Sequence, residues 1–177
     1  MLRRLWSDWV LPLLIALVLA LVIKSYVAEA RVIPSVSMEP TLKIGDRVIV
    51  QKLFFNPSEL RRGDVIVFWA PAGVSPTGDP LIKRVIGLPG DQVEVRSGTV
   101  YVNGQPLTEP YIKDKPKNDY EPPVLVPHGD LFMMGDNRNN SNDSRSWGYE
   151  KFSGVIGKAD LIYWPPAHFG KINGEPD

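Results

Sequence analysis

The feature that most constrains this chain is an uninterrupted apolar segment close to its amino terminus. Fifteen uncharged residues lie between Asp8 and Lys24, and as an α-helix they would be only about 22 Å long. A bilayer core of about 30 Å needs nearer twenty residues. Counting on to Ala28 supplies that length if Lys24 extends its ammonium group to the interface. We therefore predict a transmembrane anchor over 9–28.

Arg3 and Arg4 precede this segment and set its expected orientation. Basic residues favour the cytoplasmic side of a membrane, so residues 1–8 are expected to form a cytoplasmic tail. Two other interpretations stay open. The segment could be a cleaved secretory signal, since Ala28-Glu29-Ala30 has the small residues of a cleavage site, or a buried core helix, although it lacks a polar face. With an anchor or a signal, the rest of the chain works outside the cytoplasm.

Charge and composition exclude several classes of function. The sequence has 20 basic and 20 acidic residues, so it lacks the basic excess that nucleic-acid binding requires. It has no cysteine, which excludes disulfides, thiolate catalysis and cysteine zinc sites. The sequence also has no His and Asp cluster with metal-ligand spacing and no Gly-rich phosphate loop. We therefore expect neither a metal nor a cofactor.

Behind the apolar segment, short strand-like runs alternate with turn signals. The 15 Gly and 17 Pro are spread along the chain, and no other stretch keeps a helical apolar period. We predict an all-β domain over 29–166 with a compact barrel-like or sandwiched sheet, and a polar tail over 167–177 that frays. Residues 109–123 are expected to form an exposed loop. The expected strands are 47–52, 65–69, 81–88, 93–95, 99–102, 131–134 and 155–164.

Ser37 stands in the segment PSVSMEP, about ten residues beyond the apolar run. A serine hydroxyl becomes an effective nucleophile only when a base removes its proton. The two histidines, His128 and His168, lie in a turn and in the predicted tail. We therefore favour surface positions for both over a Ser-His triad, although a tertiary contact with Ser37 stays open. A lysine is the remaining base that can serve an uncharged hydroxyl.

Lys83 is the lysine whose sequence surroundings best suit that role. With a reference pKa near 10.4, only about one lysine in a thousand is neutral at pH 7.4, so a lysine base needs desolvation. Lys83 has apolar neighbours on a predicted strand. Alternation would place Arg84 on the opposite face, so one of the two residues can be buried while the other stays in solvent. From the pattern alone, two ordinary charges at the rim of an edge strand explain the pair better.

Four sequence blocks follow one another in a characteristic order behind the apolar segment. They are 35–42 (SVSMEPTL), 63–68 (GDVIVF), 83–91 (KRVIGLPGD) and 135–145 (GDNRNNSNDSR). In this order they resemble bacterial type I signal peptidase, and they are distributed over most of 34–164. Only a hairpin and a loop fit between the third and fourth blocks. The chain therefore resembles the shorter form of that family, which has a single membrane segment.

The resemblance implies an activity and a set of site residues. A member of this family is a membrane-bound serine endopeptidase that removes signal peptides after Ala-X-Ala-like sites, with Ser37 matching the nucleophile and Lys83 the general base. The segment 136–138 would be loop structure that holds Ser141 in place. The supporting residues that it implies are a hydroxyl for the oxyanion (Ser35), a hydrogen-bond partner of the lysine (Ser141) and an ion pair (Asp143 and Arg145).

Substrate selection is expected to depend on apolar residues beside the serine and the lysine. These residues would line shallow pockets for small side chains of a peptide extended along strand edges; they are Ile33, Met38, Leu42, Val48 and Ile82. A core role explains Leu42 and Val48 equally well. The implied partners are signal peptides of exported preproteins, the lipid bilayer and the secretion translocon. The implied location is the bacterial cytoplasmic membrane, with the catalytic domain on its outer face.

Two other functions stay open from the sequence. A self-cleaving transcriptional regulator can use the same serine and lysine chemistry, but it would carry a DNA-binding helix-turn-helix where this chain has its apolar run. A membrane-tethered β-domain that serves as a binding module would account for the anchor and the sheet. It would not account for any of the four blocks.

Overall fold

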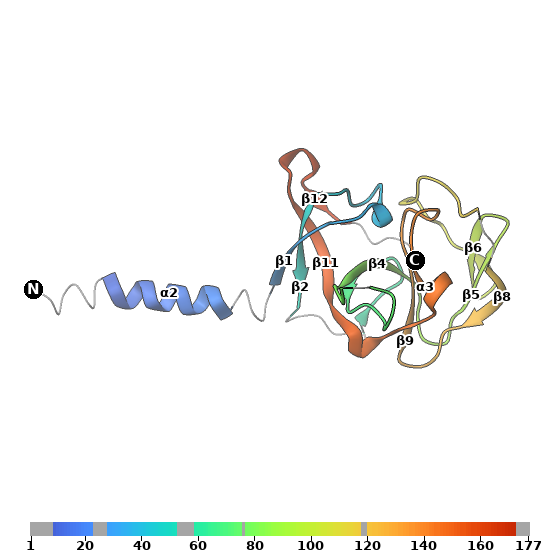
Figure 1. The fold of residues 1–177 in the computed structure, drawn as a ribbon, viewed down its shortest axis with the longest axis horizontal. Coiled ribbons are helices and arrows are strands. Elements are labelled where there is room, and N and C mark those ends of the chain that lie inside the picture. The colour runs from blue at the N-terminus through green and yellow to red at the C-terminus, as the bar shows by residue number, and fades with distance from the viewer. Residues whose placement is uncertain (1–8, 23–27, 53–58, 76, 118–119, 173–177) are drawn as a thin grey trace, which may run out of the picture.

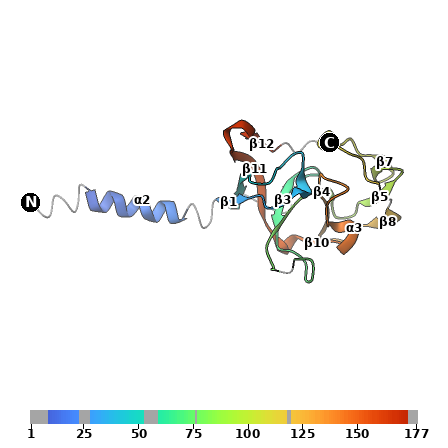
Figure 2. The same cartoon turned by 45° about the horizontal axis from the view of Figure 1, so that its top comes forward.

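The computed structural model describes residues 9–22, 28–52, 59–75, 77–117 and 120–172 (Figure 1). Within these residues the chain is mostly β, and its strands form two antiparallel sheets, the larger of which curls into a half-barrel. Figure 2 shows the strands of the two sheets in a second view. The predicted all-β class with a barrel-like sheet is therefore confirmed.

The larger sheet has the strand order β1-β2-β11-β3-β4-β9-β10, with β12 paired to β11, and the smaller sheet has the order β7-β6-β5-β8. The strands of the larger sheet are β1 (Ala28–Val32), β2 (Arg47–Gln51), β3 (Val65–Phe68), β4 (Leu81–Gly87), β9 (Asp130–Met134), β10 (Glu150–Lys151), β11 (Val155–Trp164) and β12 (Gly170–Lys171). Those of the smaller sheet are β5 (Gln92–Arg96), β6 (Thr99–Val102), β7 (Gln105–Pro106) and β8 (Tyr120–Leu125). The helical elements are α2 (Leu11–Val22), α3 (Ser144–Trp147) and the 3₁₀ turns η3 (Val36–Met38), η5 (Phe152–Gly154) and η6 (Pro166–His168).

Two tight turns build the smaller sheet. Ser97 and Gly98 have φ angles of 50° and 71°, and Asn103 and Gly104 have 52° and 77°. Positive φ at both central residues defines the type I′ turn, whose twist matches that of a β-hairpin. The first turn joins β5 to β6, as predicted, and the second folds β7 back onto β6.

The apolar segment near the amino terminus forms α2, and its leucines are exposed. Within the described ranges, no helix combines the length and the apolarity that a membrane crossing requires. Ala28, the last residue of the predicted anchor, is the first residue of β1 and lies opposite Gln51 of β2. Lys24 and residues 1–8 lie outside the described residues.

Two segments that were expected to be irregular contain strands. β8 begins inside the predicted loop 109–123, continues to Leu125 and pairs with β5. Beyond residue 166, β12 pairs with β11, and Ile172 is buried in the hydrophobic core with 7% exposure. His168 Nδ1 also lies 2.8 Å from Asp46 Oδ2. The predicted fraying is therefore wrong for 167–172, because main-chain pairing and one buried isoleucine anchor a segment of polar composition.

β4 lies near the centre of the larger sheet, between β3 and β9. Lys83 is opposite Ile66, and Arg84 is opposite Val65 on one side and Met134 on the other. Both basic side chains are buried, with exposures of 4% and 0%. The expectation that alternation leaves one of these two side chains in solvent is wrong, because both faces of the strand are covered. The expectation of an edge strand is also wrong, because β4 has a paired strand on each side.

Glu150 on β10 is a buried carboxyl group, and it makes the stability of the fold depend on pH. Burial raises its pKa to about 7, the backbone N–H of Lys151 opposes this, and Asp130 adds to it. The folded state therefore holds a proton that the unfolded state loses near pH 4.5, so stability falls as the pH rises towards 7. We expect Glu150→Gln to remove this loss and to raise the free energy of unfolding at pH 8 by about 1–3 kcal/mol.

Urea denaturation at pH 4.5 and pH 8 measures this effect. The matched control is Glu59→Gln, since Glu59 is exposed and its replacement is expected to change the pH dependence little. The assignment fails if the wild type and Glu150→Gln lose the same free energy of unfolding between the two pH values.

Candidate active site

The contact at the centre of the site joins Lys83 on β4 to Ser37 in η3. The Lys83 Nζ donates a hydrogen bond to the Ser37 Oγ at 2.5 Å. The two residues are 46 positions apart in the sequence, and both are buried, with exposures of 4% and 8%. The fold therefore brings together the serine and the lysine that the sequence singled out.

The surroundings of Lys83 lower the pKa of its ammonium group from 10.5 to about 8. Burial is the largest cause, Asp143 and Asp136 act against it, and Arg145 lowers the pKa further. At a pKa of 8, roughly a fifth of the side chains are neutral at pH 7.4, against about one in a thousand for an ordinary lysine. A neutral amine at this position can accept the proton of the Ser37 hydroxyl.

The loop that follows β9 holds η3 in place. Asn137 donates its backbone N–H to the Ser37 carbonyl oxygen and its side-chain Nδ2 to the Val36 carbonyl oxygen, both at 3.1 Å. Gly135 comes so close that an added Cβ would lie 2.4 Å from the Ser37 carbonyl oxygen and 2.3 Å from the Ser141 Oγ. Glycine is therefore required at residue 135. Sequence reasoning treated Asn137 as loop structure and missed its contact with the serine segment.

Ser35 places a second hydroxyl beside Ser37. Its Oγ lies 3.2 Å from the Ser37 Oγ. Ser35 is the N-cap residue of η3, with extended backbone angles, and its side chain makes no capping hydrogen bond. The backbone N–H groups in the first turn of a helix also lack carbonyl partners inside that helix. Hydrogen-bond donors of this kind can stabilise negative charge that develops next to a serine nucleophile.

The predicted ion pair between Asp143 and Arg145 is formed. Arg145 binds the carboxylate through Nε to Oδ1 and through Nη2 to Oδ2, both at 2.8 Å. The Gly135 N–H donates to Asp143 Oδ2 at 3.0 Å. Burial alone would raise the pKa of Asp143, but Arg145 and the Gly135 N–H together lower it. Asp143 therefore carries a fixed negative charge near Lys83.

The Ser141 hydroxyl lies in the same region without a hydrogen bond. Its Oγ is buried and has no hydrogen-bond partner within the described residues, so the implied bond to Lys83 is not formed in this structure. The hydroxyl is near enough to Asp143 to contribute to the low pKa of that carboxyl group, but its geometry satisfies no hydrogen bond. A buried hydroxyl without a partner costs free energy, and a catalytic role is one explanation for such a group in a native structure.

Arg84 anchors a second buried network on the segment that follows Ser37. Its Nε and Nη2 donate to the two carboxylate oxygens of Asp136 at 2.8 and 2.6 Å, and its Nη1 donates to the Gly63 carbonyl oxygen at 2.6 Å. The Thr41 hydroxyl donates to Asp136 at 2.5 Å, and the Tyr111 ring centroid lies 3.9 Å from the guanidinium carbon. The network connects β4 to the segment after Ser37 through Thr41 and to the loop after β9 through Asp136. No sequence pattern pointed to Thr41 or Tyr111 as members of this network.

The five predicted pocket residues belong to one hydrophobic cluster. Ile33 and Ile82 also line a cavity of about 210 Å³ between the segment ahead of Ser35 and the start of β4. The other three, Met38, Leu42 and Val48, are fully buried in the same cluster and are not among the residues that line this cavity. We call this cavity the apolar cleft; it is lined by Arg31, Val32, Ile33, Pro34, Val67, Asp79, Pro80, Leu81 and Ile82.

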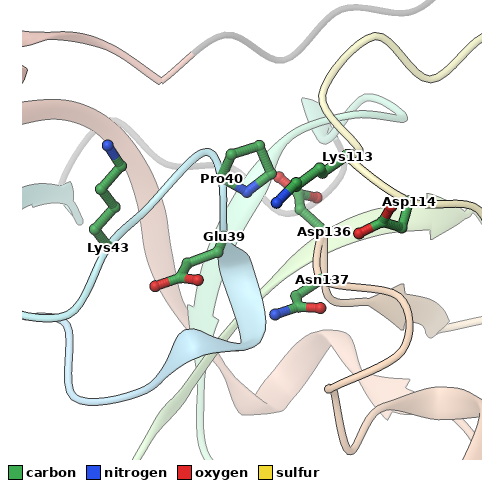
Figure 3. A pocket seen from close by; sticks show the side chains of 7 residues that line it. All are labelled: Glu39, Pro40, Lys43, Lys113, Asp114, Asp136 and Asn137. Carbon is green, nitrogen blue, oxygen red and sulfur yellow. The ribbon is translucent and has the colours of Figure 1, made fainter.

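A second cavity, of about 270 Å³, borders the residues that follow Ser37 (Figure 3). Its walls come from three segments: the chain after η3, the loop ahead of β8 and the loop after β9. We call it the charged cavity; it is lined by Glu39, Pro40, Lys43, Lys113, Asp114, Asp136 and Asn137.

Two buried acidic residues near the site serve as partners of arginines. Asp136 is bound by Arg84 and Asp143 by Arg145, in each case through two hydrogen bonds. Over the parts of the chain that the structure describes, no group of three or more His, Asp or Glu side chains is placed to hold a metal ion.

Comparisons with known proteins show the family of this chain. Residues 6–164 match the family model described as signal peptidase, peptidase S26. A probable signal peptidase I-1 of Synechocystis sp. is 48% identical, over 90% of this chain and 83% of its own length. Signal peptidase IB of Staphylococcus aureus is 33% identical, over 96% and 95%. A crystal structure of a signal peptidase I from Enterococcus faecalis is 34% identical, over 56% of this chain and 96% of that one, with a TM-score of 0.47. The chain therefore belongs to the signal peptidase family, peptidase S26, as its four sequence blocks predicted.

Proposed function

We propose that this chain removes amino-terminal signal peptides from exported preproteins, with Ser37 as nucleophile and Lys83 as general base. The observation that carries the proposal is the 2.5 Å hydrogen bond between the two side chains, inside a buried site that lowers the lysine pKa to about 8. Relatives named signal peptidase cover most of the chain, which supports the same class of substrate.

The proposed reaction begins when the neutral Lys83 amine takes the proton of the Ser37 hydroxyl. The Ser37 Oγ attacks the carbonyl carbon of the scissile peptide bond, and the oxyanion accepts hydrogen bonds from the Ser37 N–H and the Ser35 hydroxyl. Lys83 then passes the proton to the leaving amine nitrogen, and an ester on Ser37 remains. Water attacks this ester while Lys83 accepts its proton. Lys83 returns this proton to the Ser37 Oγ, and the signal peptide leaves as a carboxylic acid, which releases its own proton to solvent at neutral pH.

Positioning residues surround the two catalytic groups. We propose that the Ser141 hydroxyl orients the Lys83 amine during the reaction, and its burial without a partner supports a free donor and acceptor at this point. Asp143 and Arg145 hold the loop that carries Ser141 through the bond to Gly135. Asn137 fixes the backbone of Ser37 by donating its N–H to the Ser37 carbonyl oxygen.

The apolar cleft is the proposed binding site for the residues ahead of the cut. It lies between 31–34, which lead into the serine segment, and 79–82, which lead into Lys83. An extended peptide placed between these two segments can hydrogen-bond to both. A cavity of about 210 Å³ with Ile33 and Ile82 in its walls suits small apolar side chains, which supports cleavage after Ala-X-Ala-like sequences.

The proposed location follows from the substrate and from the amino-terminal segment. We propose that 9–28 anchors the chain in the bacterial cytoplasmic membrane, with 1–8 in the cytoplasm, the peptidase domain over 29–166 on the outer face and 167–177 as its tail. The uncharged run and the two arginines ahead of it support this topology. Exported preproteins meet such a domain as they leave the translocon, next to the lipid surface.

The decisive experiment incubates the purified full-length chain in lipid vesicles with a preprotein that carries an Ala-X-Ala site. We expect one cut after that site, detected by mass spectrometry, and no cut by Ser37→Ala. Ser153→Ala is the matched control, because Ser153 is an exposed serine outside the site. Cleavage by Ser37→Ala at the wild-type rate would overturn the proposal.

The pH profile of cleavage tests the role of Lys83. Since the neutral amine is the active form, kcat/KM is expected to rise with pH through about 8. Arg145 lowers the pKa of Lys83, and its removal also leaves the Asp143 carboxylate without its cation. We therefore expect Arg145→Met to shift the rise of kcat/KM to higher pH and to reduce the cleavage rate at pH 7.4.

Steady-state cleavage of a peptide substrate between pH 6 and pH 10 measures the pH at which kcat/KM rises. Arg61→Met, which removes an exposed arginine outside the site, is expected to leave this pH unchanged. If kcat/KM rises at the same pH in Arg145→Met as in the wild type, Lys83 does not set the pH dependence of cleavage.

A further inference from the structure

We propose that the charged cavity binds the first residues of the mature protein, on the far side of the cut bond, and selects among them by charge. This inference rests on the proposed function, because it takes Ser37 as the point of attack. It assigns a role to the cavity lined by Glu39, Lys43, Lys113 and Asp114.

The two cavities lie on opposite sides of the serine and lysine along the chain. The apolar cleft is lined by Val67 and by the residues just ahead of Ser35 and Lys83. The charged cavity is lined by residues that follow Ser37, by residues that follow Gly135, and by Lys113 and Asp114 of the loop ahead of β8. A peptide whose amino-terminal part lies in the apolar cleft presents its scissile carbonyl at Ser37. Its continuation then passes to the segment that follows Ser37, which is the wall of the charged cavity.

The wall of the charged cavity is continuous with the serine segment. Asn137 lines the cavity and also donates its backbone N–H to the Ser37 carbonyl oxygen at 3.1 Å. Glu39 is two residues after Ser37, and its backbone N–H donates to the Val36 carbonyl oxygen at 3.1 Å. A ligand in this cavity therefore lies against the same rigid segment that carries the nucleophile.

The charges of this cavity are available to a ligand. Among the described residues, none forms an ion pair with the side chains of Glu39, Lys43, Lys113 or Asp114. Asp136, at the back of the cavity, is already neutralised by Arg84. Figure 3 shows Glu39 and Lys113, two of the lining residues, on separate segments of the chain.

This arrangement predicts the class of ligand. A cavity with both signs of charge and no apolar wall comparable to that of the apolar cleft suits polar and charged side chains. A basic residue after the cut is stabilised by the Glu39 carboxylate, and an acidic residue by the Lys113 ammonium group. The residues ahead of the cut are thus selected by size and those behind it by charge.

The test uses two peptide substrates that are identical up to the cut and carry either lysine or glutamate in the first three positions after it. Glu39→Lys is expected to shift the kcat/KM ratio towards the glutamate substrate and Lys113→Glu towards the lysine substrate, each by about fivefold, as expected for one partly exposed charge pair. The matched control is Lys115→Glu, which makes the same charge change two residues further along the same loop, on a side chain that does not line the cavity.

The outcomes separate this inference from the proposed function. Opposite shifts in the two variants, with no shift in Lys115→Glu, support the charged cavity as the downstream subsite. An unchanged ratio, shifts of the same sign, or an equal shift in the control overturns it. The ratio is measured on an active enzyme, so these results leave the roles of Ser37 and Lys83 untouched, whereas active Ser37→Ala would overturn both. If a charge-reversal variant does not fold, Glu39→Gln and Lys113→Gln give the same signs with smaller shifts.

Discussion

Replacing Lys83 by methionine is expected to abolish cleavage while making the folded domain more stable. Removal of the proposed base should lower kcat/KM by about 10³-fold or more. The site lowers the pKa of Lys83 from 10.5 to about 8, so at pH 7 the folded state carries a cost of up to about 3 kcal/mol for holding this amine in a dry environment. Methionine has a similar length and no charge, so we expect the free energy of unfolding to rise by about 1–3 kcal/mol.

Two measurements on the same variant check this result: peptide cleavage, and urea denaturation at pH 7. The expected gain in stability follows from the depressed pKa of Lys83, because the unfolded chain binds the proton more tightly than the folded chain does. For the same reason, the stability of the wild type increases as the pH rises from 8 to 10.5. Lys151→Met, at an exposed lysine, is expected to change neither quantity much. Cleavage within about tenfold of the wild-type rate would remove Lys83 from the mechanism.

Replacing Arg84 by methionine is expected to have the largest effect on stability. Arg84 and Asp136 have fully buried side chains and share two hydrogen bonds. Removing the arginine leaves an uncompensated carboxylate in the interior, which costs about 3–5 kcal/mol. The double variant Arg84→Met with Asp136→Asn removes the remaining charge, so we expect it to regain part of that loss.

Thermal and urea unfolding of the single and double variants measure the two effects. Arg96→Met is the matched control, because the Arg96 side chain is about half exposed and pairs with Glu94 at 3.4 Å, and ion pairs open to solvent contribute little. Equal losses in the single and the double variant would show that the cost arises from lost packing against Tyr111 rather than from the stranded charge of Asp136.

Sequence patterns alone predicted the elements that depend on local preference. The pairs Ser97-Gly98 and Asn103-Gly104 tolerate positive φ, so the hairpin between β5 and β6 was predictable from residues next to each other in the chain. The β-branched runs at β2, β3 and β11 predicted strands for the same reason. The four blocks predicted the family, since the order of short motifs is a property of the sequence alone.

Contacts between distant residues were beyond the reach of such patterns. Asn137 holds the Val36 carbonyl group across 101 positions, and Thr41 binds Asp136 across 95. Neither residue type nor local spacing signals these partners. The polar segment 167–172 was expected to fray because the pairing of β12 with β11 and the burial of Ile172 depend on strands elsewhere in the fold.

The amino-acid sequence by itself determined the family of this protein and its β class, and it singled out Ser37 and Lys83 as candidates. Only the tertiary structure decided that Lys83 and Arg84 are both buried, that Ser37 receives the lysine hydrogen bond, and that Glu39 and Lys113 line one cavity while Ile33 and Ile82 line another. The physical reason is that turn and strand preferences act between neighbours in the chain. Desolvation and charge pairing depend on what the fold places around a side chain.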